Sequence, residues 1–230
     1  DGCAELVFHY RGPFLELQGQ ATTHSPLAHM HAQTAQHRRF VTHENFSIFG
    51  VYIYPYALPQ LFGFSAAALS NEMPDLGSLL GPAGELLTEH MLSAPDEKAR
   101  LAVLSQFLTD RLAIGKPGNL AAQAAVRQML LLDGQPPVAA LAAASGVSTR
   151  QLERQFQDYA GFSPKTYARI LRFQSALRRY GQGHKSLTDI ALDCGYYDQA
   201  HFIHDFQQFS GYVPTEYFKG SPEGVEYREA

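Results

Sequence analysis

The sequence predicts an α+β fold, in which a strand-rich N-terminal part is followed by helices and then by an all-α C-terminal part. Three observations lead to this prediction. Aromatic and β-branched residues dominate residues 5–17 and 40–58. Leucines recur at helical spacing after residue 93. A segment of about 30 residues then occurs twice, about 50 residues apart.

Strands are expected in two places. Residues 5–17 contain two apolar runs around Arg11-Gly12-Pro13, which predicts a β-hairpin. Residues 40–58 predict two further strands. Alternate residues of a strand share a face, so Tyr52, Tyr54 and Tyr56 would lie together and either pack the strand or line a small-molecule pocket.

Residues 18–40 are polar and poorly patterned, which indicates a long loop or a short edge strand. Histidines are frequent here and just beyond, at positions 24, 29, 31, 37 and 43. His29 and His31 have the spacing of two metal ligands on one strand face, but no carboxylate follows a few residues later. We therefore expect solvated or hydrogen-bonded histidines and no bound metal.

A helical segment is expected from about residue 57 to residue 133. It contains a leucine series at helical spacing: Leu101, Leu104, Leu108 and Leu112. These leucines predict packing within the chain, with a dimer contact as the alternative. Residues 134–137, Gly-Gln-Pro-Pro, favour a boundary. The predicted division is a first domain over residues 1–133, a second over 134–220 and a tail over 221–230.

The second domain is built from a duplicated unit, over residues 138–167 and 187–217. The matching pairs are Ala142 with Ala191, Gly146 with Gly195, Phe156 with Phe206, Gly161 with Gly211, Pro164 with Pro214 and Tyr167 with Tyr217. Each unit reads as a short helix, a glycine turn, and a second helix capped by Ser148 or Asp198. This pattern predicts two helix-turn-helix units, whose second helices enter the DNA major groove.

The charge distribution favours the same class of protein. The chain has a formal net charge of −4, but residues 148–185 carry eight basic residues against two acidic ones. A local positive stretch is typical of proteins that bind a phosphate backbone. A solvated helix face is the alternative interpretation.

A longer helix is expected between the two units, over residues 164–180, to hold them at a set spacing. Its polar and basic residues, with neighbours in the units, are candidates for phosphate contacts. These candidates are Thr149, Ser163, Lys165, Arg169, Arg172 and Lys185.

The segments "ALAAASGVSTRQLERQFQDYAGFSPKTYARILRFQSAL" and "SLTDIALDCGYYDQAHFIHDFQQFSGYVPTEYF" resemble the AraC/XylS family of bacterial transcription regulators over residues 137–218. "DGCAELVFHY" and "FGVYIYPYALPQLFGFSAAALSNEMPDL" resemble the small-barrel sensor domain of one subgroup. The resemblance implies a cupin-like β-barrel, binding to double-stranded DNA, control of transcription through RNA polymerase, a small-molecule effector and a homodimer.

The resemblance also implies which residues read bases. In the first unit these are Arg150, Gln151, Glu153 and Arg154, and in the second they are Ala200, His201 and His204. Arginine can bind guanine in bidentate fashion, and glutamate can accept from cytosine. The second unit departs from its relatives, because residues 186–220 contain one basic residue and five acidic ones. We therefore expect the first unit to supply most of the specific binding.

Motifs of the common enzyme classes are absent: G-x-S-x-G, the P-loop, G-x-G-x-x-G and H-E-x-x-H. The sequence therefore predicts no enzyme, no catalytic residue and no cofactor. A cupin-type metal-binding enzyme or metal sensor is the runner-up. Two widely separated cysteines favour a reducing cytoplasm, and no apolar run is long enough to predict a membrane span.

Overall fold

The N-terminal strands form two antiparallel three-stranded sheets in the computed structural model, which describes residues 2–19, 21–116, 118–180 and 186–218. One sheet has the order β4 (Ala28–His31), β1 (Ala4–Arg11), β6 (Ser47–Ile53). The other has the order β3 (Ala21–His24), β2 (Leu15–Gln18), β5 (Arg39–Val41). The predicted strands within residues 40–58 are thus confirmed.

The predicted hairpin over residues 5–17 is wrong, because β1 and β2 belong to different sheets. Gly12, at φ +71°, and Pro13 turn the chain out of the first sheet. The largely buried β1 takes the central position of its sheet, between β4 and β6, while β2 remains more exposed. Residues 18–40, expected as a loop or one edge strand, supply both β3 and β4.

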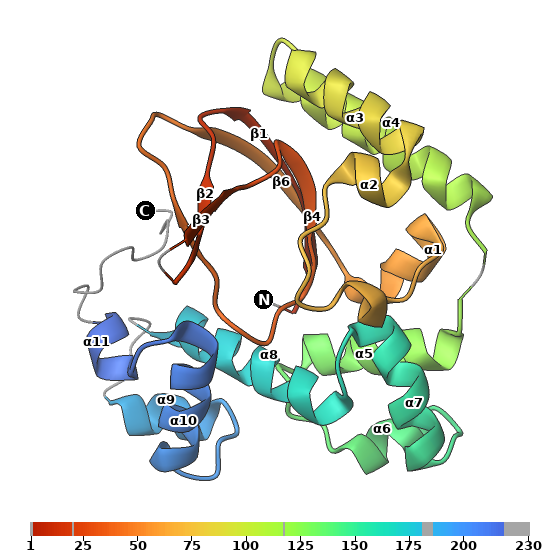
Figure 1. Cartoon of the computed structure of the whole chain (residues 1–230). Coiled ribbons are helices and arrows are strands. Elements are labelled where there is room, and N and C mark those ends of the chain that lie inside the picture. Colours follow the sequence, from red (N-terminus) through yellow and green to blue (C-terminus); the bar gives the residue numbers. More distant parts are fainter. Residues whose placement is uncertain (1, 20, 117, 181–185, 219–230) are drawn as a thin grey trace.

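The closed cupin-like barrel is not confirmed. The strands curve around a common centre in Figure 1, but no ladder among the described residues joins the two sheets. The α+β class and the order of strands before helices are as predicted.

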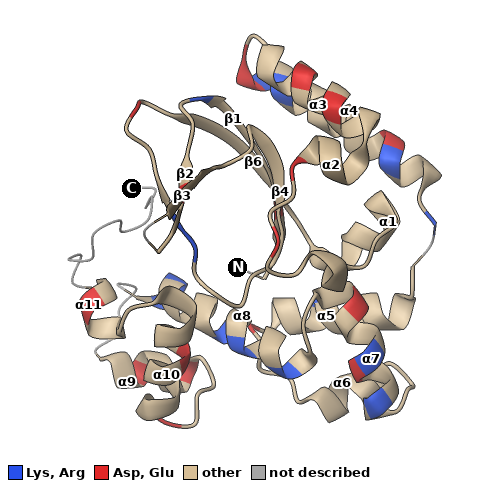
Figure 2. Cartoon of the chain, in the orientation of Figure 1, with Lys and Arg blue, Asp and Glu red and all other residues tan. Residues whose placement is uncertain are grey.

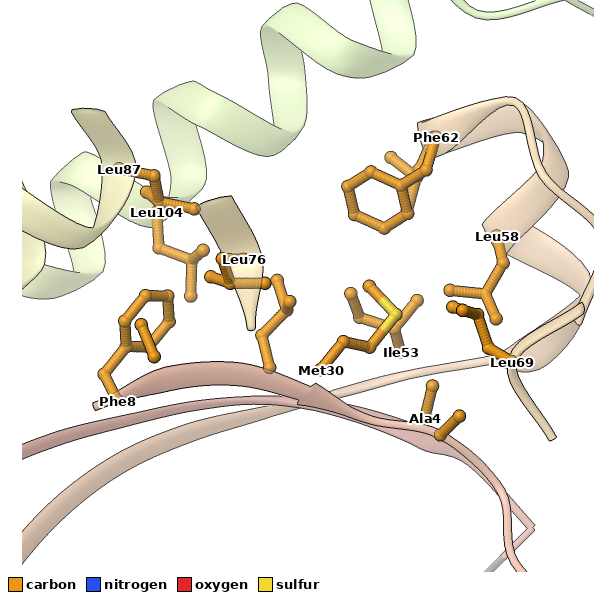
Figure 3. Close-up of a cluster of buried hydrophobic side chains, with 14 of the residues drawn as sticks. Ala4, Phe8, Met30, Ile53, Leu58, Phe62, Leu69, Leu76, Leu87 and Leu104 are labelled. Carbon is orange, nitrogen blue, oxygen red and sulfur yellow. The ribbon is translucent and has the colours of Figure 1, made fainter. Parts of the chain in front are cut away.

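Helices cover one face of the β4-β1-β6 sheet. Their bounds are η1 Pro55–Ala57, α1 Leu58–Phe62, η2 Ala66–Leu69, α2 Leu76–Leu80, α3 Pro82–Ser93 and α4 Glu97–Ile114. Figure 3 shows Phe8 and Met30 of the sheet pointing toward leucines of these helices, among them Leu104 of α4. Successive side chains of β1 point to opposite faces of the sheet, and Ala4, Leu6 and Phe8 point into this apolar core.

The remaining helices divide between two further cores. Their bounds are α5 Leu120–Leu131, α6 Val138–Ala144, α7 Thr149–Ala160, α8 Pro164–Arg179, α9 Leu187–Asp193, α10 Gln199–Ser210 and α11 Pro214–Phe218. Helix α5 shares one core with α6, α7 and the first part of α8, whereas α9, α10 and α11 share the other with the end of α8. The boundary at residue 134 stays a prediction, and the predicted tail over residues 221–230 lies outside the described residues.

Three histidines gather on the opposite face of the β4-β1-β6 sheet. The sequence predicts solvated or hydrogen-bonded histidines, and His29 follows the second alternative, with its Nδ1 3.1 Å from the carbonyl oxygen of Pro26. His9 and His29 are buried, and their rings stack with 5.3 Å between centroids. His31 is half-buried beside His29. The sequence pattern could not indicate this cluster, because His9 lies on β1 and comes close to His29 and His31 only when β1 pairs with β4.

Acid is expected to destabilise the protein through these histidines. Desolvation by burial, with the charge of His29, lowers the pKa of His9 and of His31 from 6.5 to about 4. Between those values the unfolded chain binds protons that the folded chain does not. Stability therefore falls as the pH drops through this window, by on the order of 3 kcal/mol for the two residues together, allowing for residual solvent access.

The measurement is urea unfolding at pH 7.5 and pH 5, compared between the wild type and His31→Phe. The variant should lose part of the pH dependence. His24→Gln, at an exposed histidine, is the control and should keep it. Equal pH dependence in the wild type and His31→Phe would contradict the assignment.

None of the helices described is both long and apolar enough to cross a membrane.

Candidate nucleic-acid interface

The first helix-turn-helix unit consists of α6, a glycine turn and α7. Gly146 adopts φ +68°, and the amide of Val147 donates back to the carbonyl of Ala142 over 3.1 Å. The Ser148 hydroxyl then accepts from the Gln151 amide over 3.3 Å and begins α7. These local bonds confirm the turn and the cap expected from the sequence.

Helix α7 buries one face and exposes the other. Leu152, Phe156 and Ala160 are fully buried in the core with α5, α6 and α8. The exposed face carries the predicted base-reading residues and their neighbours: Thr149, Arg150, Gln151, Glu153, Arg154 and Gln157. These donors and acceptors are therefore presented together on one surface of a helix held from behind.

The second unit repeats this construction with α9 and α10. Gly195 adopts φ +78°, and the Asp198 carboxylate accepts from the His201 amide over 2.7 Å. Phe202 and Phe206 are fully buried, as the aromatic spacing predicts. Both copies of the repeat thus present their second helix in the same way.

The buried face of α10 also contains a carboxylate. Asp205 is 1% exposed and accepts bonds from Arg169 of α8, over 3.1 Å from Nε and 2.6 Å from Nη2. These hydrogen bonds raise the pKa of Arg169 against the effect of desolvation. Arg169 also donates to Gln208 over 2.6 Å. In the structure this arginine joins α10 to α8, and its predicted contact with phosphate stays a prediction.

The two histidines that were predicted to read bases differ in how exposed their side chains are beside Asp205. The His201 ring lies 3.7 Å from this carboxylate, and its side chain is 39% exposed. His204 approaches the carboxylate at 3.5 Å but remains 75% exposed. The exposed residues of α10 are Gln199, Ala200, His204, Gln207 and Gln208.

The other phosphate candidates occupy different environments. Thr149, Ser163 and Lys165 are exposed, and Ser163 also caps α8. Arg172 is half-buried and donates to the carbonyl of Gly134 over 3.2 Å. Lys185 lies outside the described residues.

Helix α8 contributes to the cores of both units. Tyr167 is fully buried in the first core, with its ring 5.7 Å from Phe156. Phe173 lies two turns later and packs 5.1 Å from Phe206 in the second core. A single helix therefore spaces the two units, as the sequence predicts.

Charge is distributed unequally between the units. Figure 2 shows basic residues on α7 and α8, whereas α9, α10 and α11 contain acidic residues and no lysine or arginine. This asymmetry agrees with the charge counts along the sequence.

Two features of the second unit had weak signals in the sequence. Asp205 lies at i+3 from Phe202 and i+7 from Asp198, within the buried aromatic stripe, and that position could have identified it as buried. Tyr197, in the turn before α10, is 89% exposed. An aromatic residue so exposed beside a predicted reading helix is a further candidate for contact with DNA.

The three tyrosines predicted to share a strand face do not do so. Strand β6 ends at Ile53, and Pro55 begins a 3₁₀ turn, so the alternation stops before Tyr54. The rings of Tyr54 and Tyr56 stack with 5.3 Å between centroids. Tyr56 borders a groove of 360 Å³ with Leu120, Arg127 and Leu131, and Tyr52 is not part of its lining.

The histidine cluster does not form a metal centre by geometry. Among the described residues, no group of three histidine, cysteine, aspartate or glutamate side chains is placed to hold a metal ion. The metal-binding alternative therefore gains no support from this part of the chain.

Two segments of the chain match the models of known families. Residues 141–220 match a family described as a helix-turn-helix domain, and residues 1–75 match a domain of unknown function, DUF6597. The chain is 36% identical over 84 residues to the HTH-type transcriptional regulator GbdR of Pseudomonas aeruginosa, a match covering 36% of this chain and 23% of GbdR.

A second relative is the HTH-type transcriptional activator RhaS of Escherichia fergusonii, which is 33% identical over 38% of this chain and 31% of RhaS. The matches thus span less than a third of these curated relatives. The crystal structure of ToxT from Vibrio cholerae O395 superimposes over 95% of this chain and 89% of ToxT, with a TM-score of 0.51 and 12% identity. That likeness is one of fold, and it extends over nearly the whole chain.

Proposed function

Because residues 141–220 form an AraC/XylS-type double helix-turn-helix domain, we propose that this protein binds double-stranded DNA sequence-specifically and regulates transcription. The observation that carries the proposal is the exposed face of α7, where Arg150, Glu153 and Arg154 stand together on a helix anchored from behind. These residue types read guanine and cytosine edges in the major groove. Family resemblance supports RNA polymerase as the protein partner.

The two units have unequal tasks in this proposal. Unit one reads bases through α7, while exposed groups such as Thr149, Ser163 and Lys165 contact phosphates. Unit two presents His204, with His201 partly withdrawn toward Asp205, and lacks basic residues on its helices. Its contribution to affinity is therefore smaller than that of unit one.

Selection of bound sequences from a randomised DNA library, at two salt concentrations, tests the proposal. Two enriched half-elements about one helical turn, ~34 Å, apart would identify both units as readers. A single enriched half-element would assign base reading to α7 alone. Retention without enrichment at either salt concentration would reject sequence-specific binding.

We also propose that the protein forms a homodimer through α4. Leu101 and Leu112 are 58% and 48% exposed, and they lie on one stripe of α4 with Ser105 and the partly buried Leu108. This spacing of i, i+4, i+7 and i+11 is that of a coiled-coil seam. In an antiparallel pair, Leu101 would oppose Leu112 of the partner subunit, and the same register brings Glu97 near Lys116 of the partner subunit.

Leu112→Glu is expected to convert the dimer to a monomer, because it places an unpaired carboxylate against Leu101 of the partner subunit at both ends of the seam. The dimer dissociation constant should rise by about 100-fold or more, measured by sedimentation equilibrium. Gln106→Glu, an exposed substitution on another face of α4, is the control and should leave it unchanged. A wild type that sediments as a monomer at all concentrations would reject this dimer.

The small-molecule effector remains part of the proposal, with the histidine cluster as its contact surface in place of the three tyrosines. His9 Nδ1 and His31 Nε2 are buried and have no hydrogen-bond partner within the described protein. A polar ligand between the two sheets would satisfy these atoms. Thermal stabilisation by members of a panel of small polar molecules, abolished by His31→Phe, would support this location.

A further inference from the structure

The chain between β4 and β5, residues 32–38, reaches from the first domain to the ends of both predicted reading helices. Its backbone is anchored at Asn71, whose amide donates to the Gln33 carbonyl over 2.9 Å and whose side chain accepts from the Ala35 amide over 2.9 Å. Arg38, at the end of this segment, forms an ion pair with Glu16 of β2 over 3.3 Å. The segment is thus fixed to both sheets and to the turn after η2.

The first contact is made at the C-terminal end of α7. Gln33 is fully buried, and its side chain donates to the Ala160 carbonyl over 3.2 Å. Ser70, from the turn that holds the segment, donates to the Gly161 carbonyl over 2.7 Å. Carbonyls at the end of a helix lack partners within the helix, so these two bonds make a strong joint.

The second contact is made at the C-terminal end of α10. A Cβ placed on Gly211 would lie 2.7 Å from two ring atoms of His37, so the ring rests directly on this glycine. Arg39, the first residue of β5, places its guanidinium 5.2 Å from the centroid of the Tyr212 ring. His37 and Arg39 are both exposed.

The two contacts fall on equivalent positions of the duplicated unit. Gly161 and Gly211 both end their helices in the left-handed conformation, at φ +84° and +78°, and are a matched pair of the repeat. The first contact is buried and hydrogen-bonded, whereas the second is exposed and formed by ring packing and a cation–π interaction. One segment of the first domain therefore holds α7 firmly and α10 weakly.

We propose that His37 and Arg39 are positioning residues that set the placement of α10 relative to α7, and hence the spacing between DNA half-elements that the protein accepts. The second unit has its own core and is joined to the first through α8. The His37–Arg39 contact supplies a second point of attachment, so a rigid-body tilt about the end of α8 is restrained. The effect on the spacing of half-elements rests on the proposed DNA binding. The contact of His37 and Arg39 with the end of α10 does not.

A spacer panel tests the consequence. Full-length protein is titrated with duplexes that carry the selected half-elements at the preferred spacing, or with one base pair added or removed. In Arg39→Ala and His37→Ala, the ratio of affinities between preferred and shifted spacings should fall by about two- to fivefold, the size expected of an exposed cation–π contact. The preferred sequence of each half-element should not change.

The matched control is Arg11→Ala, which removes the same charge from an exposed position on β1. It should leave the spacing ratio at the wild-type value. Arg39→Lys retains a cation over the Tyr212 ring and should restore most of the ratio. If Arg39→Ala weakens binding to every spacing by the same factor, the ratio of affinities between preferred and shifted spacings is unchanged. That result would overturn the proposal in favour of a general electrostatic role.

A second measurement requires no DNA. Spin labels on Gln157→Cys and Gln207→Cys, at exposed sites of α7 and α10 in a Cys3→Ser background, report the distance distribution between the reading helices by double electron–electron resonance. Arg39→Ala should broaden this distribution, and Arg11→Ala should not. An unchanged distribution in Arg39→Ala overturns the inference even if DNA binding is established. A broadened distribution supports it even if the DNA selection fails.

Discussion

Arg154→Ala is expected to abolish most discrimination at one base pair of the DNA site while leaving affinity for unrelated sequences nearly unchanged. Arg154 is exposed on α7 beside Arg150 and Glu153, and a bidentate arginine contributes about 1–3 kcal/mol of discrimination against the wrong base. That free energy corresponds to roughly 5- to 150-fold at a single position. The readout is the position-specific enrichment obtained from a binding-site library.

Lys165→Ala is the comparison, because Lys165 is exposed at the start of α8 and assigned to phosphate. It should weaken binding to all sequences by a similar factor and reduce the slope of log affinity against log salt by about 1. If the two variants alter the library in the same way, the division between base reading and phosphate contact is incorrect.

Asp205→Ala is expected to destabilise the second helix-turn-helix unit by about 3 kcal/mol. The substitution leaves Arg169 without its principal partner and opens a space beneath α10, and the loss of one member of a buried ion pair is costly. Arg169 remains partly solvated, so the cost should lie toward the lower end of the usual range. Thermal unfolding followed by circular dichroism measures it.

Asp158→Ala, at an exposed carboxylate on α7, is the control and should change stability by no more than about 0.5 kcal/mol. The double substitution Arg169→Met, Asp205→Leu should recover stability, since an apolar pair removes both desolvation costs. If Asp205→Ala unfolds like Asp158→Ala, the ion pair does not stabilise the protein in solution.

Local signals made the C-terminal half predictable. The glycine turns, the caps at Ser148 and Asp198 and the 3.6-residue spacing of buried aromatics all act within a few residues of the chain. The repeat contains the same helix, glycine turn and capped second helix twice. The spacing of the buried residues in that second helix then indicates which face of α7 is exposed. Residue-level roles in binding remain predictions.

The N-terminal half was less predictable, because strand pairing joins residues far apart in sequence. The two apolar runs around Gly12 satisfied a hairpin pattern, but burial of β1 favoured pairing with β4 and β6 instead. The prediction that Tyr52, Tyr54 and Tyr56 share a strand face is wrong for a related reason. It assumed a strand that continues past Pro55, but β6 ends at Ile53 and a 3₁₀ turn begins at Pro55. Each error came from assuming that a local pattern decides a non-local arrangement.

The sequence by itself determined the helix-turn-helix repeat, the class of partner proposed for it and the faces of α7 and α10 that are exposed, because helices form from contacts within one chain segment. Only the tertiary structure decided that Arg169 serves Asp205, that His9 joins His29 and His31, and that residues 33–39 reach the ends of both reading helices. These partners lie tens of residues apart. Their meeting depends on how sheets and helices pack, which no periodicity in the sequence records.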